Sequence, residues 1–175
     1  AAASDVYKRQ SIHGGSLRIY VKHAENTTIK IEQKVKNLIK KEIEEGLDLV
    51  SNYESFSKRA TECKLKIWDF FISAKQNNKK IIGYGAPAKG NTMLNFCGIG
   101  PEIIEYTVDI SPHKQGLFLP GTHIPIKKPE IIKETKPDYV VILSWNFKDE
   151  IVEQMKYIRD WGGKFVVLHP KIVVC

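Results

Sequence analysis

Two kinds of hydrophobic pattern divide the 175-residue chain. In the first half, apolar residues recur every three or four positions, which predicts one helix from about residue 26 to 46 and a second over residues 51–76. Asn26 and the two threonines after it provide an N-cap for the first helix. The second helix carries a long apolar stripe that we expect to pack against a sheet: Tyr53, Phe56, Ala60, Cys63, Leu65, Ile67, Trp68, Phe71 and Ile72.

From Lys79 onward, short apolar runs alternate with helical segments. The predicted strands are residues 80–84, 103–109, 139–144 and 164–168, and the predicted helices are residues 88–96, 129–134 and 147–161. This alternation predicts an α/β fold, a Rossmann-like, doubly wound and mostly parallel sheet preceded by two long helices. In such folds, ligands bind beyond the carboxyl ends of the strands.

The N-terminal region has a different character. Residues 5–10 (DVYKRQ) back-translate to the end of a transposase adaptor, so we predict that residues 1–10 are a cloning artefact. Residues 11–25 contain a Gly-Gly turn and a short alternating strand, which needs partner strands. We therefore predict that residues 11–25 are the last strand of a truncated upstream domain and that residues 26–175 form one Rossmann-like domain.

Composition excludes several classes of partner. The net charge is +7, but the lysines between residues 30 and 66 alternate with glutamates at helical spacing, which favours a solvated helix face over a nucleic-acid site. No apolar run approaches the ~18 residues of a membrane span, and the N-terminus is not of secretory type. We predict a soluble, cytoplasmic protein without nucleic-acid or membrane partners. The cysteines, Cys63, Cys97 and Cys175, are odd in number and indicate neither a disulfide framework nor a metal site.

The segment IIGYGAPAKGNT, residues 81–92, carries the most chemical information. Gly83, Gly85 and Ala88 satisfy the G-x-G-x-x-G/A pattern between a predicted strand and a predicted helix. Gly83 suits the positive φ of a tight turn, and Gly85 allows close approach to the backbone. Pro87 suits a first helical turn, where free N–H groups and the Lys89 ammonium favour a diphosphate. The predicted binding residues here are Gly83, Gly85, Ala86, Pro87, Ala88, Lys89, Gly90 and Asn91.

Further candidate residues follow the other predicted strands. Asp109 lies about 20 residues beyond the loop, where a Rossmann domain places the acid that binds ribose hydroxyls. The irregular stretch 111–126 offers Lys114 and Gln115 for a phosphate or a base, and a Pro120-Gly121 turn. The alternative is that the glycines only form a tight turn and Asp109 only caps a loop.

The strand over residues 139–144 is followed directly by Trp145 and Asn146. Trp145 suits stacking on a base or sugar ring, and Asn146 suits hydrogen bonding to the same ligand. The other interpretation is that Asn146 caps the helix that begins at Phe147. Both residues are candidates for substrate binding.

Three motifs in this order, GYGAPAKGNTMLNFCGI, VDISPHKQGLFLPGTHIPI and SWNFKDEI, resemble the C-terminal domain of S-adenosylmethionine-dependent sugar C-methyltransferases. The resemblance extends from about residue 34 to the end. It implies an enzyme of deoxysugar biosynthesis, in which this domain binds a nucleotide sugar such as a dTDP-sugar and packs against a methyltransferase domain that the chain lacks.

The resemblance also implies that the missing domain binds S-adenosylmethionine and that zinc belongs to a missing N-terminal region. We therefore assign no catalytic residue and no metal ligand here, and expect the chain alone to be inactive. Two alternatives stay open. The first is a stand-alone NAD(P)- or nucleotide-binding Rossmann module, and the second is a non-catalytic interaction module that uses the basic helical face.

Overall fold

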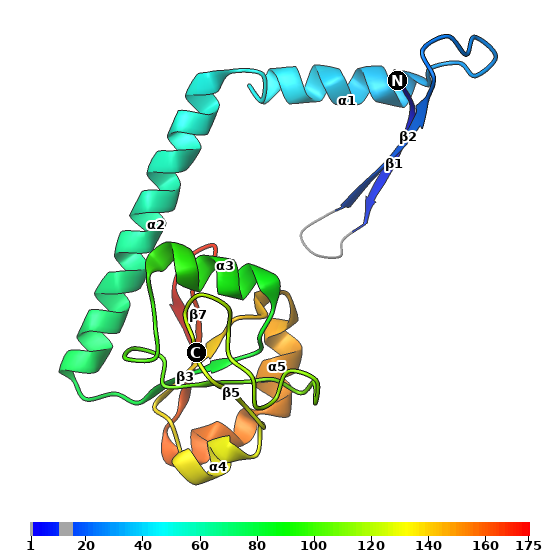
Figure 1. Cartoon of the computed structure of the whole chain (residues 1–175). Helices are drawn as coiled ribbons and strands as arrows, with labels where there is room; N and C mark the ends of the chain where they lie inside the picture. Colours follow the sequence, from blue (N-terminus) through cyan, green and yellow to red (C-terminus); the bar gives the residue numbers. More distant parts are fainter. Residues whose placement is uncertain (1, 11–15) are drawn as a thin grey trace. The chain divides into compact units, whose positions relative to one another are not determined.

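The computed structural model describes residues 2–10 and 16–175, and the chain forms two compact units, Ala1–Arg59 and Ala60–Cys175 (Figure 1). In the first unit, β1 (Ala2–Gln10) pairs antiparallel with β2 (Ser16–Lys22), and α1 (Gln33–Glu44) packs on this hairpin through the buried Val35. The short strand predicted after the Gly-Gly turn, with Leu17, Ile19 and Val21 on one side, is observed as β2, and the predicted turn itself lies outside the described residues. The partner of β2 is a strand of the same chain. The boundaries predicted at residues 10 and 25 stay predictions.

The first long helix begins later than predicted. Asn26 Oδ1 accepts hydrogen bonds from the N–H and the hydroxyl of Thr28, at 3.0 and 2.7 Å, and the helix begins only at Gln33. Asparagine side chains often bond neighbouring backbone groups in turns, and here that turn replaces the predicted helix cap. The expected N-cap at Asn26 is therefore wrong.

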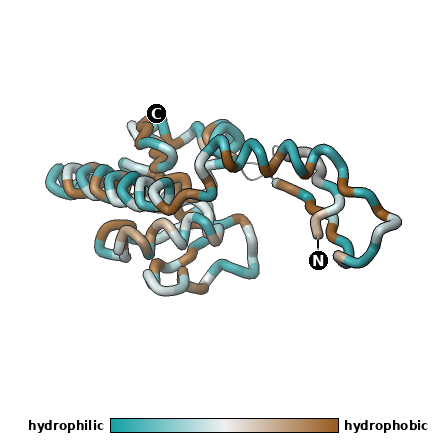
Figure 2. Tube along the Cα trace, turned by 90° about the horizontal axis from the view of Figure 1, so that it is seen from above, coloured by the Kyte–Doolittle hydropathy of each residue, from teal (hydrophilic) through white to brown (hydrophobic). Residues whose placement is uncertain are grey.

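The second long helix, α2 (Val50–Gln76), uses only part of its apolar stripe. Ile67, Phe71 and Ala74 are buried in the core of the second unit, whereas Tyr53 and Phe56 are 58% and 63% exposed. Leu65 and Ile72 also stay largely exposed. The expectation that the whole stripe packs on a sheet is therefore wrong for part of its length, because several of its side chains are exposed. In Figure 2, apolar positions recur along both long helices between hydrophilic ones.

The second unit is built on a six-stranded sheet with the order β5-β4-β3-β6-β7-β8. Its strands are β3 (Ile81–Tyr84), β4 (Thr107–Val108), β5 (Ile126–Lys127), β6 (Tyr139–Ile142), β7 (Lys164–Val167) and β8 (Val173–Val174). All neighbouring pairs are parallel except β7 with β8. The helical elements are α3 (Ala88–Cys97), α4 (Ile131–Thr135), η2 (Trp145–Phe147), α5 (Lys148–Gln154) and η3 (Lys156–Trp161).

Buried side chains cover both faces of this sheet. On one face, Ile81 packs in a cluster with Phe71 of α2 and Leu94 of α3. On the other, Ile82 packs in a second cluster with Ile132 of α4 and Ile151 of α5. Successive strand residues point to opposite faces, so the unbroken apolar runs supply both cores. The predicted Rossmann-like, doubly wound and mostly parallel fold is confirmed.

Local differences from the predicted elements have physical causes. β4 is two residues long, since Ile103 and Ile104 belong to the turns after α3. The two-residue strands β5 and β8 are too short to leave a periodic signal. The helix predicted over residues 147–161 is divided into η2, α5 and η3. In the described part of the chain, no helix combines the length and the apolar character that crossing a bilayer requires.

Candidate functional site

The carboxyl ends of three neighbouring strands meet at one edge of the sheet. β3 lies between β4 and β6, so the glycine loop that follows β3 is flanked by Asp109 after β4 and by Ser144 and Trp145 after β6. This is the edge where doubly wound sheets bind ligands. The topology therefore brings together the residues predicted from three separate sequence motifs.

Gly85, rather than Gly83, makes the tight turn. Gly85 has a φ of 90°, a region that disfavours residues with a side chain, and its N–H donates to the Val108 carbonyl at 2.6 Å. The Thr107 hydroxyl donates to the Gly85 carbonyl at 2.8 Å. Gly83 lies inside β3, where an added Cβ would come within 2.7 Å of Thr107 Oγ1. Gly83 is thus needed for close packing of β3 on β4, and the positive φ predicted for it is wrong.

The N-terminus of α3 points into this edge. Pro87 is the residue before the helix, with a φ of −83°, and α3 runs from Ala88 to Cys97. The first N–H groups of a helix have no partner within it, and the helix dipole makes this end electropositive. Lys89 lies in that first turn and is half-buried. The predicted anion-binding character of the loop therefore has the expected local geometry.

Gly90 lets α3 approach the end of β6. An added Cβ at Gly90 would lie 2.8 Å from Leu143 Cβ and 3.1 Å from the Leu143 carbonyl oxygen. Both distances are too short for unstrained contact, and a backbone atom cannot rotate away. This glycine therefore lets the N-terminus of α3, the predicted anion-binding end, pack closely on the end of β6.

We expect Gly90→Ala to lower the free energy of unfolding by about 1–3 kcal/mol, because the added methyl group overpacks the contact between α3 and Leu143. Gly100→Ala is the matched control, since Gly100 has no positive φ and its added Cβ meets only the end of the flexible Glu102 side chain. Denaturant unfolding followed by circular dichroism measures both. Equal or smaller destabilisation by Gly90→Ala would show that α3 tolerates displacement from Leu143.

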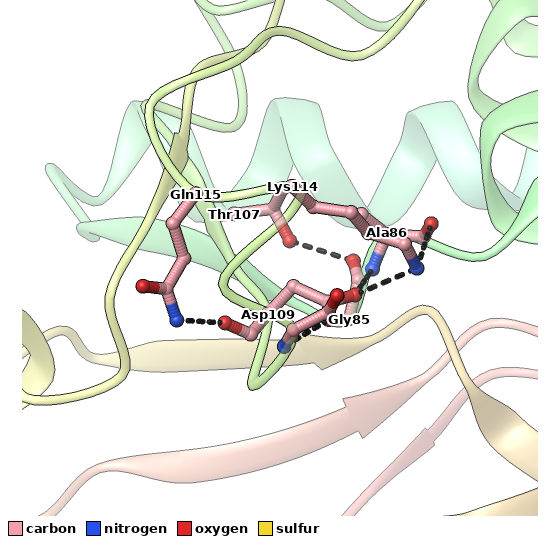
Figure 3. Close-up of polar contacts among 7 residues, drawn as sticks. Gly85, Ala86, Thr107, Asp109, Lys114 and Gln115 are labelled. Atoms are coloured by element: carbon pink, nitrogen blue, oxygen red, sulfur yellow. Dashed lines mark hydrogen bonds and ion pairs between the residues drawn. The ribbon is translucent and has the colours of Figure 1, made fainter.

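The Asp109 side chain bonds three groups at this edge of the sheet (Figure 3). Its Oδ2 accepts a hydrogen bond from the Ala86 N–H at 2.8 Å and lies 3.2 Å from Lys114 Nζ. Its Oδ1 accepts from the Ser111 N–H at 2.9 Å, and Gln115 Nε2 donates to its backbone carbonyl at 2.9 Å. Asp109 is only 8% exposed, and each of its two carboxylate oxygens has at least one partner within the protein.

Lys114 lies beside the glycine loop, whereas Gln115 bonds the Asp109 backbone carbonyl, and their predicted contacts with a phosphate or a base stay predictions. Lys114 Nζ donates to the Ala86 carbonyl at 3.1 Å as well as to Asp109, so two of its three N–H donors serve the protein. Pro120 and Gly121 lie elsewhere: Asn95 Nδ2 donates to the Pro120 carbonyl at 3.0 Å, near the C-terminal end of α3. At about 1.5 Å per residue, Asn95 is roughly 10 Å along the helix from Ala88. The fold does not bring Pro120 and Gly121 to the glycine loop.

An aromatic group borders the other side of the loop. Lys89 Nζ lies 4.6 Å from the centre of the Trp145 ring, within the range of a cation–π contact. Partial burial lowers the pKa of the Lys89 ammonium. The His169 ring is centred 5.4 Å from that of Trp145.

Asn146 is exposed and does not cap α5, whose N-cap is Phe147, so the capping interpretation of Asn146 is not supported.

Sequence reasoning missed two residues at this edge, His169 and Thr107. His169 comes directly after the strand predicted to end at Leu168, so the rule that ligands gather at carboxyl ends would have identified it. Thr107 carried no signal, because its role depends on the pairing of β4 with β3. Among the described residues, no group of three or more histidine, cysteine or acidic side chains is placed to hold a metal ion.

Comparison with known proteins decides the family. The sequence model of the C-methyltransferase C-terminal domain matches residues 11–170. The chain belongs to this family. C-methyltransferase NovU from Streptomyces niveus is 32% identical to this C-methyltransferase C-terminal domain over 160 residues, which are 91% of the chain and 38% of NovU. The chain thus spans about two fifths of the length of that relative.

Among solved structures, UDP-D-quinovosamine 4-dehydrogenase from Vibrio fischeri resembles the C-methyltransferase C-terminal domain with a TM-score of 0.39 and 18% identity, over 51% of this chain and 76% of the dehydrogenase.

Proposed function

We propose that this C-methyltransferase C-terminal domain binds the diphosphate of a nucleotide sugar at the glycine loop and holds the sugar for methylation at carbon. The observation that carries the proposal is the N-terminus of α3 with Lys89 in its first turn and Lys114 beside Ala86. Free N–H groups, a helix dipole and two ammonium groups at one sheet edge form an environment that favours a diphosphate.

Trp145 supports a ligand that extends beyond its phosphates. The ring lies beside the Lys89 ammonium at the same edge, and Asn146 next to it is exposed. A base or sugar attached to the diphosphate would reach an aromatic surface and an amide without leaving the edge. This domain would then orient the substrate, and orientation of the reacting carbon towards a methyl donor lowers the entropic part of the barrier.

The residues present do not fit S-adenosylmethionine. That molecule carries a sulfonium cation and no phosphate, whereas the glycine loop presents Lys89 and Lys114, and the Asp109 carboxylate is paired within the protein. Like charges at this edge disfavour a cation. We therefore propose that the methyl donor, and the zinc ion implied by the family resemblance, belong to other parts of a longer enzyme, and that this chain alone is inactive.

We further propose that the exposed apolar side chains of the first unit contact such a methyltransferase part. Ile39 and Ile43 on α1 and Tyr53 and Phe56 on α2 are all more than half exposed. Ile39 and Ile43 line one open surface hollow on α1, and apolar patches of this kind are typical of interfaces. The proposed enzyme acts in the cytoplasm, where nucleotide sugars serve as substrates of sugar modification.

The proposal is tested by titrating the 175-residue chain with dTDP, dTDP-glucose, NAD and S-adenosylmethionine in a calorimeter at low salt. We expect both dTDP compounds to bind, because each carries the diphosphate that the α3 N-terminus and Lys89 favour. Tighter binding of NAD than of either dTDP compound would favour the stand-alone Rossmann module instead. Tighter binding of S-adenosylmethionine would contradict the assignment of the methyl donor to another part.

A further inference from the structure

The Asp109 carboxylate is directed at the protein's own backbone. A carboxylate has about four lone-pair positions, and three of them are engaged by the Ala86 N–H, the Ser111 N–H and the Lys114 ammonium. With 8% of the residue exposed, little of the remaining capacity faces solvent. A ribose that used Asp109 in the usual Rossmann manner would have to displace one of these partners.

The partners of Asp109 also hold the glycine loop from both sides. The Ala86 N–H donates to Asp109 Oδ2 at 2.8 Å, while the Ala86 carbonyl accepts from Lys114 Nζ at 3.1 Å. Lys114 and Asp109 are themselves 3.2 Å apart. Both backbone groups of Ala86 are thus bonded to one ion pair, which we call the loop clamp: Asp109 and Lys114. Both backbone groups of the preceding residue, Gly85, are bonded as well: its carbonyl accepts from the Thr107 hydroxyl, and its N–H donates to the Val108 carbonyl.

This arrangement has an electrostatic consequence. The Asp109 carboxylate offsets the charge of Lys114, and Lys89 has no acidic partner among the described ion pairs. A diphosphate at the loop would therefore contact the Lys89 ammonium and the α3 N–H groups. Lys114 has one N–H that is not bonded to Ala86 or Asp109, and this N–H is also available to the diphosphate. A ribose hydroxyl near Asp109 would find its carboxylate already hydrogen-bonded to Ala86, Ser111 and Lys114. Recognition at this edge thus rests on phosphate charge.

We propose that Asp109 is a positioning residue that fixes the glycine loop through Ala86, and that the site selects the diphosphate and does not distinguish ribose from 2′-deoxyribose. This inference rests on the proposed function for its ligand, and it replaces the ribose contact that the sequence predicts for Asp109. The substrate class is therefore any nucleoside diphosphate sugar that fits the base and sugar contacts, whichever pentose it carries.

The experiment compares the wild-type chain with Asp109→Asn in calorimetric titrations with inorganic pyrophosphate, UDP and 2′-deoxy-UDP. We expect the wild type to bind UDP and 2′-deoxy-UDP within about twofold of each other. We expect Asp109→Asn to change the affinity for all three ligands by a similar factor, because a loosened loop weakens the anion site while the Lys114 ammonium, no longer offset by a carboxylate, strengthens it. Asp149→Asn is the matched control, since the Asp149 side chain is 99% exposed, and should bind as the wild type does.

A ligand-free measurement separates this inference from the proposed function. In the wild type, we expect slow hydrogen exchange at the Ala86 amide, and about tenfold faster exchange in Asp109→Asn. If no anion binds to the wild type, the proposed function fails, and unchanged exchange in the variant would overturn the clamp itself. Selective loss of UDP with unchanged pyrophosphate binding, or a tenfold wild-type preference for UDP over 2′-deoxy-UDP, would overturn the role of Asp109. The wild-type comparison stands even where the variant fails to fold.

Discussion

Replacing Phe71 by alanine should lower the free energy of unfolding of the second unit by about 3–5 kcal/mol. Phe71 has no exposed surface, and its ring contacts that of Phe70 edge-on with 5.3 Å between their centres. It joins the last turns of α2 to the sheet, in the same cluster as Ile81 and Leu94. Removing the ring leaves a cavity that neighbouring backbone cannot fill. Urea unfolding of the chain, followed by far-ultraviolet circular dichroism, measures the change.

Phe56→Ala is the matched control, because it removes the same side chain from the same helix at a position that is 63% exposed. We expect a change within about 0.5 kcal/mol there. A cost at Phe56 as large as that at Phe71 would mean that the N-terminal half of the stripe is buried in solution, in conflict with the exposure described above. Equal and small effects would mean that α2 does not dock on the sheet.

Lys89→Ala should weaken binding of dTDP by about ten- to a hundredfold, which corresponds to about 1.5–3 kcal/mol for a hydrogen bond to a charged group. Lys89 lies in the first turn of α3, and its ammonium has no carboxylate partner among the described ion pairs, so a phosphate oxygen would be its natural counter-charge. Calorimetric titration with dTDP, at two salt concentrations, measures the loss. The wild type should also show the steeper salt dependence.

The control is Lys164→Ala. Lys164 is exposed and begins β7, so it lies at the amino end of the sheet, opposite the edge that carries the glycine loop. We expect dTDP to bind this variant as it binds the wild type. If both variants lose affinity equally, binding reflects the overall positive charge of the domain. If neither does, the diphosphate lies away from α3.

Together, these predictions separate the scaffold from the site. Phe71 and Gly90 contribute to how α2 and α3 pack on the sheet, whereas the proposed roles are direct ligand contact for Lys89 and support of the Ala86 backbone for Asp109. A variant of the first kind should change stability and binding together. Lys89→Ala should leave stability almost unchanged, since its side chain is only half-buried and contributes no hydrogen bond among those described.

Much of the fold was predictable because strong hydrophobic periodicity reports burial. The strands β3, β6 and β7 and the helices α2 and α3 lie within one or two residues of their predicted bounds. The burial of the α2 stripe was predicted less well, because several of its apolar side chains are exposed. The glycine loop could also be predicted from the sequence, because only glycine tolerates the φ of 90° at position 85 and the close contact at position 83. The sequence did not show that Gly85 makes the tight turn and that Gly83 allows the close packing on Thr107.

The remaining features depend on residues that are distant in sequence. β4 exists because two residues pair with β3 on one side and β5 on the other, and two residues carry no period of their own. Pro120 and Gly121 shared a loop with Lys114, but Asn95 holds them at the far end of α3. No pattern within a short window encodes such contacts.

The sequence by itself therefore determined the fold class, the edge of the sheet where the candidate site lies and the glycine loop after β3, because periodicity and glycine placement are local properties. Tertiary structure alone decided what Asp109 does. Its carboxylate meets the Ala86 N–H from 23 positions earlier in the chain and the Lys114 ammonium from five positions later. The parallel pairing of β3 with β4 places the Ala86 N–H within hydrogen-bonding distance, and the turn from Ser111 to Lys114 brings the ammonium to the same carboxylate.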